Sequence, residues 1–134
     1  MNKFTSFKNW AEEEQEEFKN PPIEDLEPYT YNLFGRNINK NILGVGWLDE
    51  NRPYNKGEVP IAFIEKLKKA KKINHTKGWH DCPFCGKARG SCEIIVRNNN
   101  KTYLAPELII HYIENHNYAP PQEYINVVIN NYEN

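Results

Sequence analysis

The chain has 134 residues, of which 39% are hydrophobic and 13% aromatic, and its formal net charge is −1. This length is that of one domain, and the aromatic content argues against a disordered chain. The sequence has neither the run of about 20 apolar residues typical of a membrane span nor the apolar stretch of a signal peptide, and its three cysteines are an odd number. These features argue against a membrane protein and against a disulfide framework, so we expect a soluble cytoplasmic protein.

Charged residues are distributed unevenly along the chain. Residues 12–27 carry eight acidic residues and one lysine, which gives −7, whereas residues 66–89 carry eight basic residues and one aspartate, which gives +7. The near-zero net charge therefore hides an acidic N-terminal part and a basic central segment.

The N-terminal part predicts a helix followed by a linker. Apolar residues over 6–19 nearly follow helical spacing with glutamates between them, and the pair Pro21-Pro22 ends this helix. Residues 20–32 are rich in proline and acidic residues, which is typical of an extended segment. We therefore expect two parts: residues 1–32, an acidic helix and linker, and residues 33–134, a folded α+β domain.

The folded part contains helical and strand patterns in alternation. Apolar residues at helical spacing and an opening proline indicate helices, and two β-rich runs around Asn98-Asn99-Asn100 indicate a hairpin. Asn115 to Asn117 end one of the helices, because asparagine tolerates the left-handed conformation. The expected elements are a helix over 60–72, a hairpin over 92–97 and 101–105, and helices over 106–115 and 121–132.

Cysteine and histidine residues form the pattern that carries chemistry. Cys82 and Cys85 enclose Pro-Phe, and after 25 further residues His111 and His116 enclose four residues. Two thiolates and two imidazoles make a tetrahedral shell that suits Zn²⁺, and the hairpin brings the two halves together. The sequence predicts a structural zinc site in residues 33–134, with a knuckle, hairpin and helix as a ββα-like core and additional helices packed around it.

Helix geometry limits this site, and His80 offers an alternative to it. Positions i and i+5 of an ideal helix lie about 140° apart, so both imidazoles reach one ion only if the helix loosens near Asn115. Otherwise one of His111 and His116 is an ordinary surface or core residue. In that case His80, which lies two residues before Cys82, replaces that histidine as the fourth ligand. Alternatively, His80 contacts one of the ligands from outside the metal shell.

Other chemistry for these residues is less well supported by the sequence. A redox cysteine pair needs a helix after it, and the glycine-rich residues 86–90 do not predict one. Cys92, next to strand residues, is expected to be a small buried side chain. Four protein ligands leave no open coordination position, so we expect no enzyme; a metalloenzyme with Glu114 as base requires such a position.

Two surface features are candidates for contact with a partner. The basic segment offers Lys68, Lys69, Lys71, Lys72 and Trp79 to nucleic acid or to a protein, although such charge runs are usually solvated helix faces. The segment "YAPPQEY" is expected to expose tyrosines, Tyr118 among them, beside the metal site.

Three stretches, "GWLDENRPYNKGEVPIAFIEKL", "HDCPFCG" and "YLAPELIIHYIENHNYAPPQEYI", are similar to those of a set of uncharacterised bacterial proteins. This resemblance covers about residues 44–129. It implies that Cys82, Cys85, His111 and His116 belong together, and it implies no activity. We therefore expect a non-enzymatic, zinc-stabilised bacterial binding module that contacts another protein, with nucleic-acid binding through residues 66–89 as the alternative.

Overall fold

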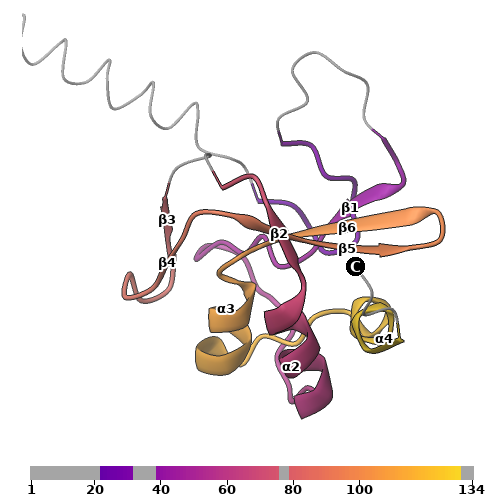
Figure 1. Ribbon diagram of the computed structural model, residues 1–134. Helices are drawn as coiled ribbons and strands as arrows, with labels where there is room; N and C mark the ends of the chain where they lie inside the picture. Colours follow the sequence, from indigo (N-terminus) through magenta and orange to yellow (C-terminus); the bar gives the residue numbers. More distant parts are fainter. Residues whose placement is uncertain (1–21, 32–38, 76–78, 131–134) are drawn as a thin grey trace, which may run out of the picture.

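The computed structural model describes residues 22–31, 39–75 and 79–130 and has the α+β fold that the sequence predicted (Figure 1). Its described residues form three helices and two sheets, of four and two strands. The helix expected over 6–19 lies outside them. The elements are β1 (Ile42–Gly44), α2 (Ile61–Lys69), β2 (Lys71–Ile73), β3 (His80–Asp81), β4 (Arg89–Gly90), β5 (Glu93–Asn98), β6 (Lys101–Pro106), α3 (Ile109–His116) and α4 (Gln122–Asn130).

The β5–β6 hairpin is the centre of the larger sheet. Ile94, Ile95 and Val96 favour the extended conformation, and alternate side chains face opposite sides of the sheet. The turn contains Asn99 at φ 48°, a left-handed conformation that asparagine tolerates. The predicted hairpin is thus confirmed to within a residue. The strand order is β1–β6–β5–β2, in which β1 is parallel to β6 and the other pairs are antiparallel.

Helix α2 is shorter than the sequence predicted. The pattern predicts a helix over 60–72, but Ala70 leaves the helical conformation with ψ at 156°. Residues Lys71–Ile73 instead form β2, in which Lys72 pairs with Ile94 of β5. Backbone hydrogen bonds to the edge of β5 outweigh the high helix propensity of these lysines.

The three described helices lie on one side of the larger sheet and bury aromatic residues against it (Figure 1). The Tyr124 ring of α4 lies 5.9 Å from the Phe63 ring of α2 and 5.7 Å from the Tyr103 ring of β6, measured between centroids. The largest fully buried side chains all belong to this core: Val45, Phe63, Leu67, Ile94, Val96, Tyr103, Ile109, Tyr118 and Tyr124.

Residues 22–31 cover the opposite side of the sheet. Ile23, Tyr29 and Tyr31 are buried there, in a second cluster with Ile95 and Leu104. The same segment bonds to the outer edge of β1 through backbone groups, with N···O distances of 2.8 to 2.9 Å. The described part of the expected linker is therefore packed on the sheet. The division of the chain after residue 32 stays a prediction.

Helix α3 begins later than predicted because β6 continues through Pro106. Its end is as predicted, since Asn117 adopts the left-handed conformation at φ 57°. Helix α4 agrees with the predicted helix over 121–132 as far as residue 130, the last one described. Among the described residues, no helix is long and apolar enough to cross a membrane.

Candidate metal centre

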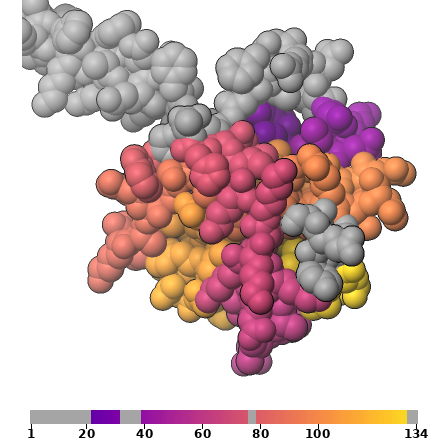
Figure 2. Space-filling model, viewed as in Figure 1, coloured from indigo at the N-terminus to yellow at the C-terminus, as the bar shows by residue number. Residues whose placement is uncertain are grey.

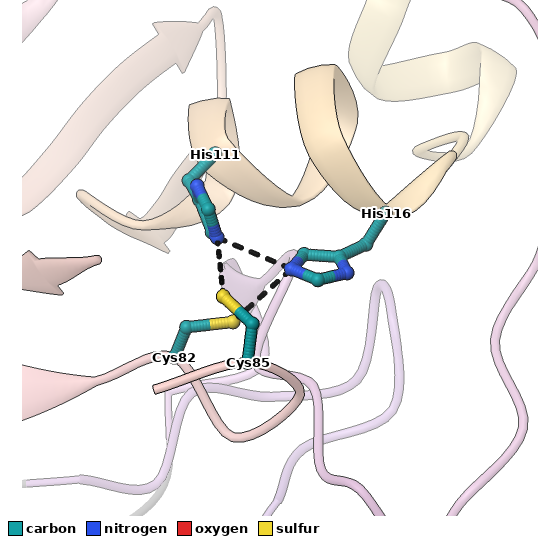
Figure 3. A group of neighbouring side chains, drawn as sticks. All are labelled: Cys82, Cys85, His111 and His116. Atoms are coloured by element: carbon teal, nitrogen blue, oxygen red, sulfur yellow. Dashed lines mark hydrogen bonds between the residues drawn. The ribbon is translucent and has the colours of Figure 1, made fainter. Parts of the chain in front are cut away.

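The β3–β4 hairpin shapes the first half of the centre. Its strands pair His80 with Gly90, and the Cys82 amide bonds to the Ala88 carbonyl at 2.9 Å. Gly86 closes the turn at φ 65° and donates its N–H to the Cys82 carbonyl at 2.9 Å. This tight turn directs the sulfurs of Cys82 and Cys85 to the same side, toward α3 (Figure 3).

Helix α3 supplies the second half. The Nε2 atom of His116 lies 3.4 Å from Sγ of Cys82, and Nε2 of His111 lies 3.4 Å from Sγ of Cys85. The two Nε2 atoms are 3.1 Å apart (Figure 3). All four candidate ligand atoms lie within 4.8 Å of one another, and both cysteines are free thiols. The structure therefore brings together the four residues that the spacing selected.

These distances match those within a tetrahedral metal site. Bond lengths of about 2.3 Å to sulfur and about 2.05 Å to nitrogen give sulfur–nitrogen separations of about 3.6 Å and a nitrogen–nitrogen separation of about 3.3 Å. The observed separations of 3.4 and 3.1 Å are only slightly shorter. Cys82, Cys85, His111 and His116 are thus close enough to hold a metal ion.

The two imidazoles of the His-x4-His pair meet although α3 is helical from Ile109 to His116. The Asn117 amide bonds to the Tyr112 carbonyl, five residues earlier, and the Tyr118 amide lies 3.2 Å from the same oxygen. These bonds cap the C-terminus of α3 just after His116, where Asn117 is left-handed. Since α3 is helical through His116, the loosening predicted near Asn115 stays a prediction.

Aromatic side chains pack against His116 and bond to its carbonyl. The Phe84 ring, between the two cysteines, lies 5.2 Å from the His116 ring and 5.7 Å from the Tyr112 ring. The Tyr54 ring lies 5.2 Å from Phe84, and its hydroxyl donates to the His116 carbonyl at 2.7 Å. This contact satisfies one of the carbonyls that a helix leaves unbonded at its C-terminus.

The environment of the histidines favours ligation. Burial lowers the pKa of His111, the neighbouring His116 lowers it further, and Glu114 opposes the shift. A low pKa keeps the imidazole neutral, as a metal ligand must be. The side-chain amide of Asn115 lies 3.1 Å from Nδ1 of His111 and is placed to orient that ring.

The family comparison agrees with this fold. Residues 22–129 match the family model described as a domain of unknown function, DUF7919. The chain belongs to the DUF7919 family. The match begins where residues 22–31 start to cover the sheet of the DUF7919 fold, and it ends within α4. No curated protein and no solved structure matches the chain. An uncharacterised family, as the resemblance implied, is thereby shown, whereas the bacterial origin stays a prediction.

His80 and Cys92 both lie outside the four-residue cluster of the DUF7919 chain. His80 is exposed on β3 and lines a cavity of about 20 Å³, the size of a single water, together with Cys92 and Glu107. Cys92 is 8% exposed and free. Burial and the Glu107 carboxylate raise the pKa of its thiol to about 11. Cys92 is thus the small buried side chain that the sequence predicted.

The prediction that the segment "YAPPQEY" exposes its tyrosines is wrong. Tyr118 and Tyr124 are both fully buried. The Tyr118 hydroxyl donates to Oδ2 of Asp25 at 2.7 Å, which gives the ring a hydrogen-bond partner inside the core. Tyr118 is therefore part of the core and is not available as a partner contact.

The basic candidates lie on the surface, but some are already paired. Nζ of Lys68 lies 3.0 Å from the Glu114 carboxylate. Lys69, Lys71 and Lys72 are exposed. Trp79 is 67% exposed, and the Arg89 guanidinium lies 5.9 Å from its ring centroid. In Figure 2, β2 and the β3–β4 hairpin lie on the same face of the molecule.

The sequence did not single out Tyr54 or Asp25. Tyr54 lies in a turn-rich segment with no pattern that points to α3. Asp25 accepts the Gly46 amide at 2.9 Å as well as the Tyr118 hydroxyl. In the sequence it is one of eight acidic residues in the segment 12–27, and nothing distinguishes it from its neighbours. Only the tertiary structure identifies these two residues.

Proposed function

We propose that this DUF7919 protein is a non-enzymatic, zinc-stabilised binding module that contacts another protein. The observation that carries the proposal is the cluster of two cysteine sulfurs and two imidazole nitrogens at separations that fit a tetrahedron. Zinc is the metal proposed because borderline-soft thiolate and imidazole ligands in a tetrahedral shell suit Zn²⁺.

A structural role for the metal follows from the number and packing of its ligands. Cys82, Cys85, His111 and His116 fill all four positions of a tetrahedral ion, so no position remains for water or substrate. The Phe84 ring packs on the His116 ring, and Tyr54 packs on Phe84 and bonds to the His116 carbonyl. Zinc would then join the β3–β4 hairpin to α3 and add its binding free energy to that of the fold. Reduced thiols of this kind fit a cytoplasmic location.

A protein partner is favoured by the charges around the hairpin. Asp81 pairs with Arg89 at 2.8 Å, and Glu114 pairs with Lys68, so two cations of the basic segment are already neutralised. Trp79 remains exposed beside Arg89. Tryptophan and arginine are the residue types that most often dominate binding energy at protein interfaces.

Nucleic-acid binding is the second candidate, because Lys69, Lys71, Lys72 and Trp79 are exposed and β2 lies on the same face as the β3–β4 hairpin. Affinity for a labelled single-stranded oligonucleotide decides between the two. Phosphate contacts produce binding that weakens steeply with salt. We expect no such binding; binding that weakens steeply with salt and is lowered by Trp79→Ala would favour the second candidate.

The metal content of purified protein tests the zinc site. We expect a single zinc ion in the wild-type chain and its loss in Cys82→Ser and His116→Ala. Cys92→Ser is the matched control, since this thiol lies outside the cluster, and it should keep the metal. A wild-type protein without metal, or a Cys82→Ser protein with the wild-type content, contradicts the proposal.

A further inference from the structure

A cavity of about 260 Å³ lies between the 22–25 segment and the 47–55 segment. This volume is far larger than that of a water and approaches that of small-ligand pockets, which begin at about 300 Å³. Its exposed wall is mostly polar, with charged groups among the lining, and two aromatic side chains, Trp47 and Tyr54, also line it. The lining residues that matter here are Glu24, Asp25, Trp47, Asp49, Arg52 and Tyr54.

The two aromatic walls of the cavity are held rigidly. Trp47 donates its indole N–H to the Leu104 carbonyl at 2.9 Å, and its ring meets the Tyr31 ring at 4.8 Å. Tyr54 is held by its hydrogen bond to His116 at the metal centre. Fixed aromatic rings are suited to stack on a planar, positively charged group, and the Tyr54 ring already has one cation nearby, the Lys56 ammonium at 5.3 Å from its centroid.

The charges of the lining are unbalanced. Glu24, Asp25 and Asp49 face a single cation, Arg52, which already pairs with Glu24. The two recorded partners of Asp25, the Gly46 amide and the Tyr118 hydroxyl, are both neutral. Burial raises the pKa of Asp25 by more than these two hydrogen bonds lower it.

We infer that this cavity receives an arginine side chain of the partner protein, between the Trp47 and Tyr54 walls and against Asp25 and Asp49. The inference rests on the proposed function and adds the chemistry of the partner to it. A guanidinium group stacks on aromatic rings and bonds to carboxylates in its plane. A lysine ammonium offers only a point charge, so the planar walls favour arginine.

The same geometry couples the cavity to the metal. Tyr54 is both a wall of the cavity and the donor to the carbonyl of His116. Loss of the metal frees the end of α3 and with it this wall. Binding in the cavity should therefore weaken when the metal is removed, although no metal ligand lines the cavity.

Nuclear magnetic resonance of the isotope-labelled full chain tests the inference. The probes are two capped peptides, acetyl-Gly-Arg-Gly-amide and its citrulline analogue, which is neutral and nearly isosteric. We expect the arginine peptide to shift the Trp47 indole N–H and the Asn55 side-chain amide, both of which belong to the lining. The citrulline peptide should not shift these two signals.

Charge variants provide the matched controls. Asp49→Asn should weaken the arginine peptide roughly three- to fivefold, as expected for partly exposed ion pairs. Glu65→Gln removes the same charge from the exposed surface of α2, away from the cavity, and should leave the affinity unchanged. Equal shifts with citrulline, or an equal loss in Glu65→Gln, overturn the inference.

Metal analysis of the same samples separates the two proposals. A zinc-loaded protein that ignores both peptides overturns the cavity inference and leaves the proposed function standing. A protein that contains no zinc overturns the proposed function, whatever the peptides do.

Discussion

Single hydroxyl groups show how closely the core is connected to the candidate metal centre. Tyr54 bonds to the His116 carbonyl, and Tyr118 bonds to Asp25. Tyr124 is fully buried, and its hydroxyl has no hydrogen-bond partner in the described residues. The three tyrosine hydroxyls thus differ: one bonds to a helix-end carbonyl, one bonds to a carboxylate, and one has no partner among the described residues.

A series of tyrosine-to-phenylalanine variants measures these roles. Tyr118→Phe should reduce the free energy of unfolding by about 1.5–3 kcal/mol, since it removes a hydrogen bond to a charged group, and Tyr54→Phe by about 1 kcal/mol. Tyr124→Phe serves as the control and should be neutral or stabilising, because it removes an unsatisfied buried hydroxyl. Chemical denaturation of the metal-loaded proteins gives the three values. A loss in Tyr124→Phe as large as that in Tyr118→Phe contradicts this ranking.

Elements in the DUF7919 fold were predictable where their pattern is local. The β5–β6 hairpin and the left-handed end of α3 follow from β-branched runs and from asparagine. The end of α2 was not predictable, because Lys71 and Lys72 are good helix formers that become strand residues only when β5 offers them an edge. The sequence of residues 22–31 is typical of a linker. Its packing could not be predicted, because it depends on the second face of the sheet, which the sequence does not reveal.

The contact between β6 and α4 should depend on pH. The Tyr103 hydroxyl donates to Glu123 at 2.6 Å, and Lys101 lies 3.2 Å from the same carboxylate. The hydrogen bond and then the lysine lower the pKa of Glu123 below its ordinary value, despite some burial. A lowered folded-state pKa gives stability that is present above the unfolded-state pKa and is lost as the pH falls through the folded-state value.

Comparison of wild type with Glu123→Gln isolates this effect from acid release of the metal. The difference in unfolding free energy should be largest near pH 7, begin to shrink near the ordinary glutamate pKa of about 4.3, and close as the pH falls through the lower folded-state value. Denaturation curves at several pH values measure it. A difference that does not change between these limits would show that the carboxylate contributes nothing through its charge.

The whole molecule depends on contacts between distant segments. The cysteine and histidine spacing identified all four members of the cluster, because ligand chemistry restricts both residue type and spacing. Burial of Tyr118 and the cavity beside Trp47 depend on Asp25, 93 residues away from Tyr118 in the sequence. Such long-range pairs leave no local pattern, which is why the sequence assigned Tyr118 to the surface.

Removal of the metal should destabilise the whole DUF7919 fold. A structural zinc ion contributes on the order of 10 kcal/mol in small domains, and about 1 kcal/mol shifts Tm by several degrees in a domain of this size. A chelator should therefore lower Tm by more than about 10 °C, and zinc, but not magnesium, should restore it. Hydrogen exchange should show residues 79–90 and α3 losing protection before the β5–β6 hairpin.

X-ray absorption at the zinc edge of the purified protein tests the central claim most directly. We predict two sulfur ligands at about 2.3 Å and two nitrogen ligands at about 2.0–2.1 Å around one ion. His111→Ala should keep both sulfurs and lose one nitrogen. A spectrum with only oxygen and nitrogen ligands, or with four sulfurs, would contradict a metal centre that joins the β3–β4 hairpin to α3.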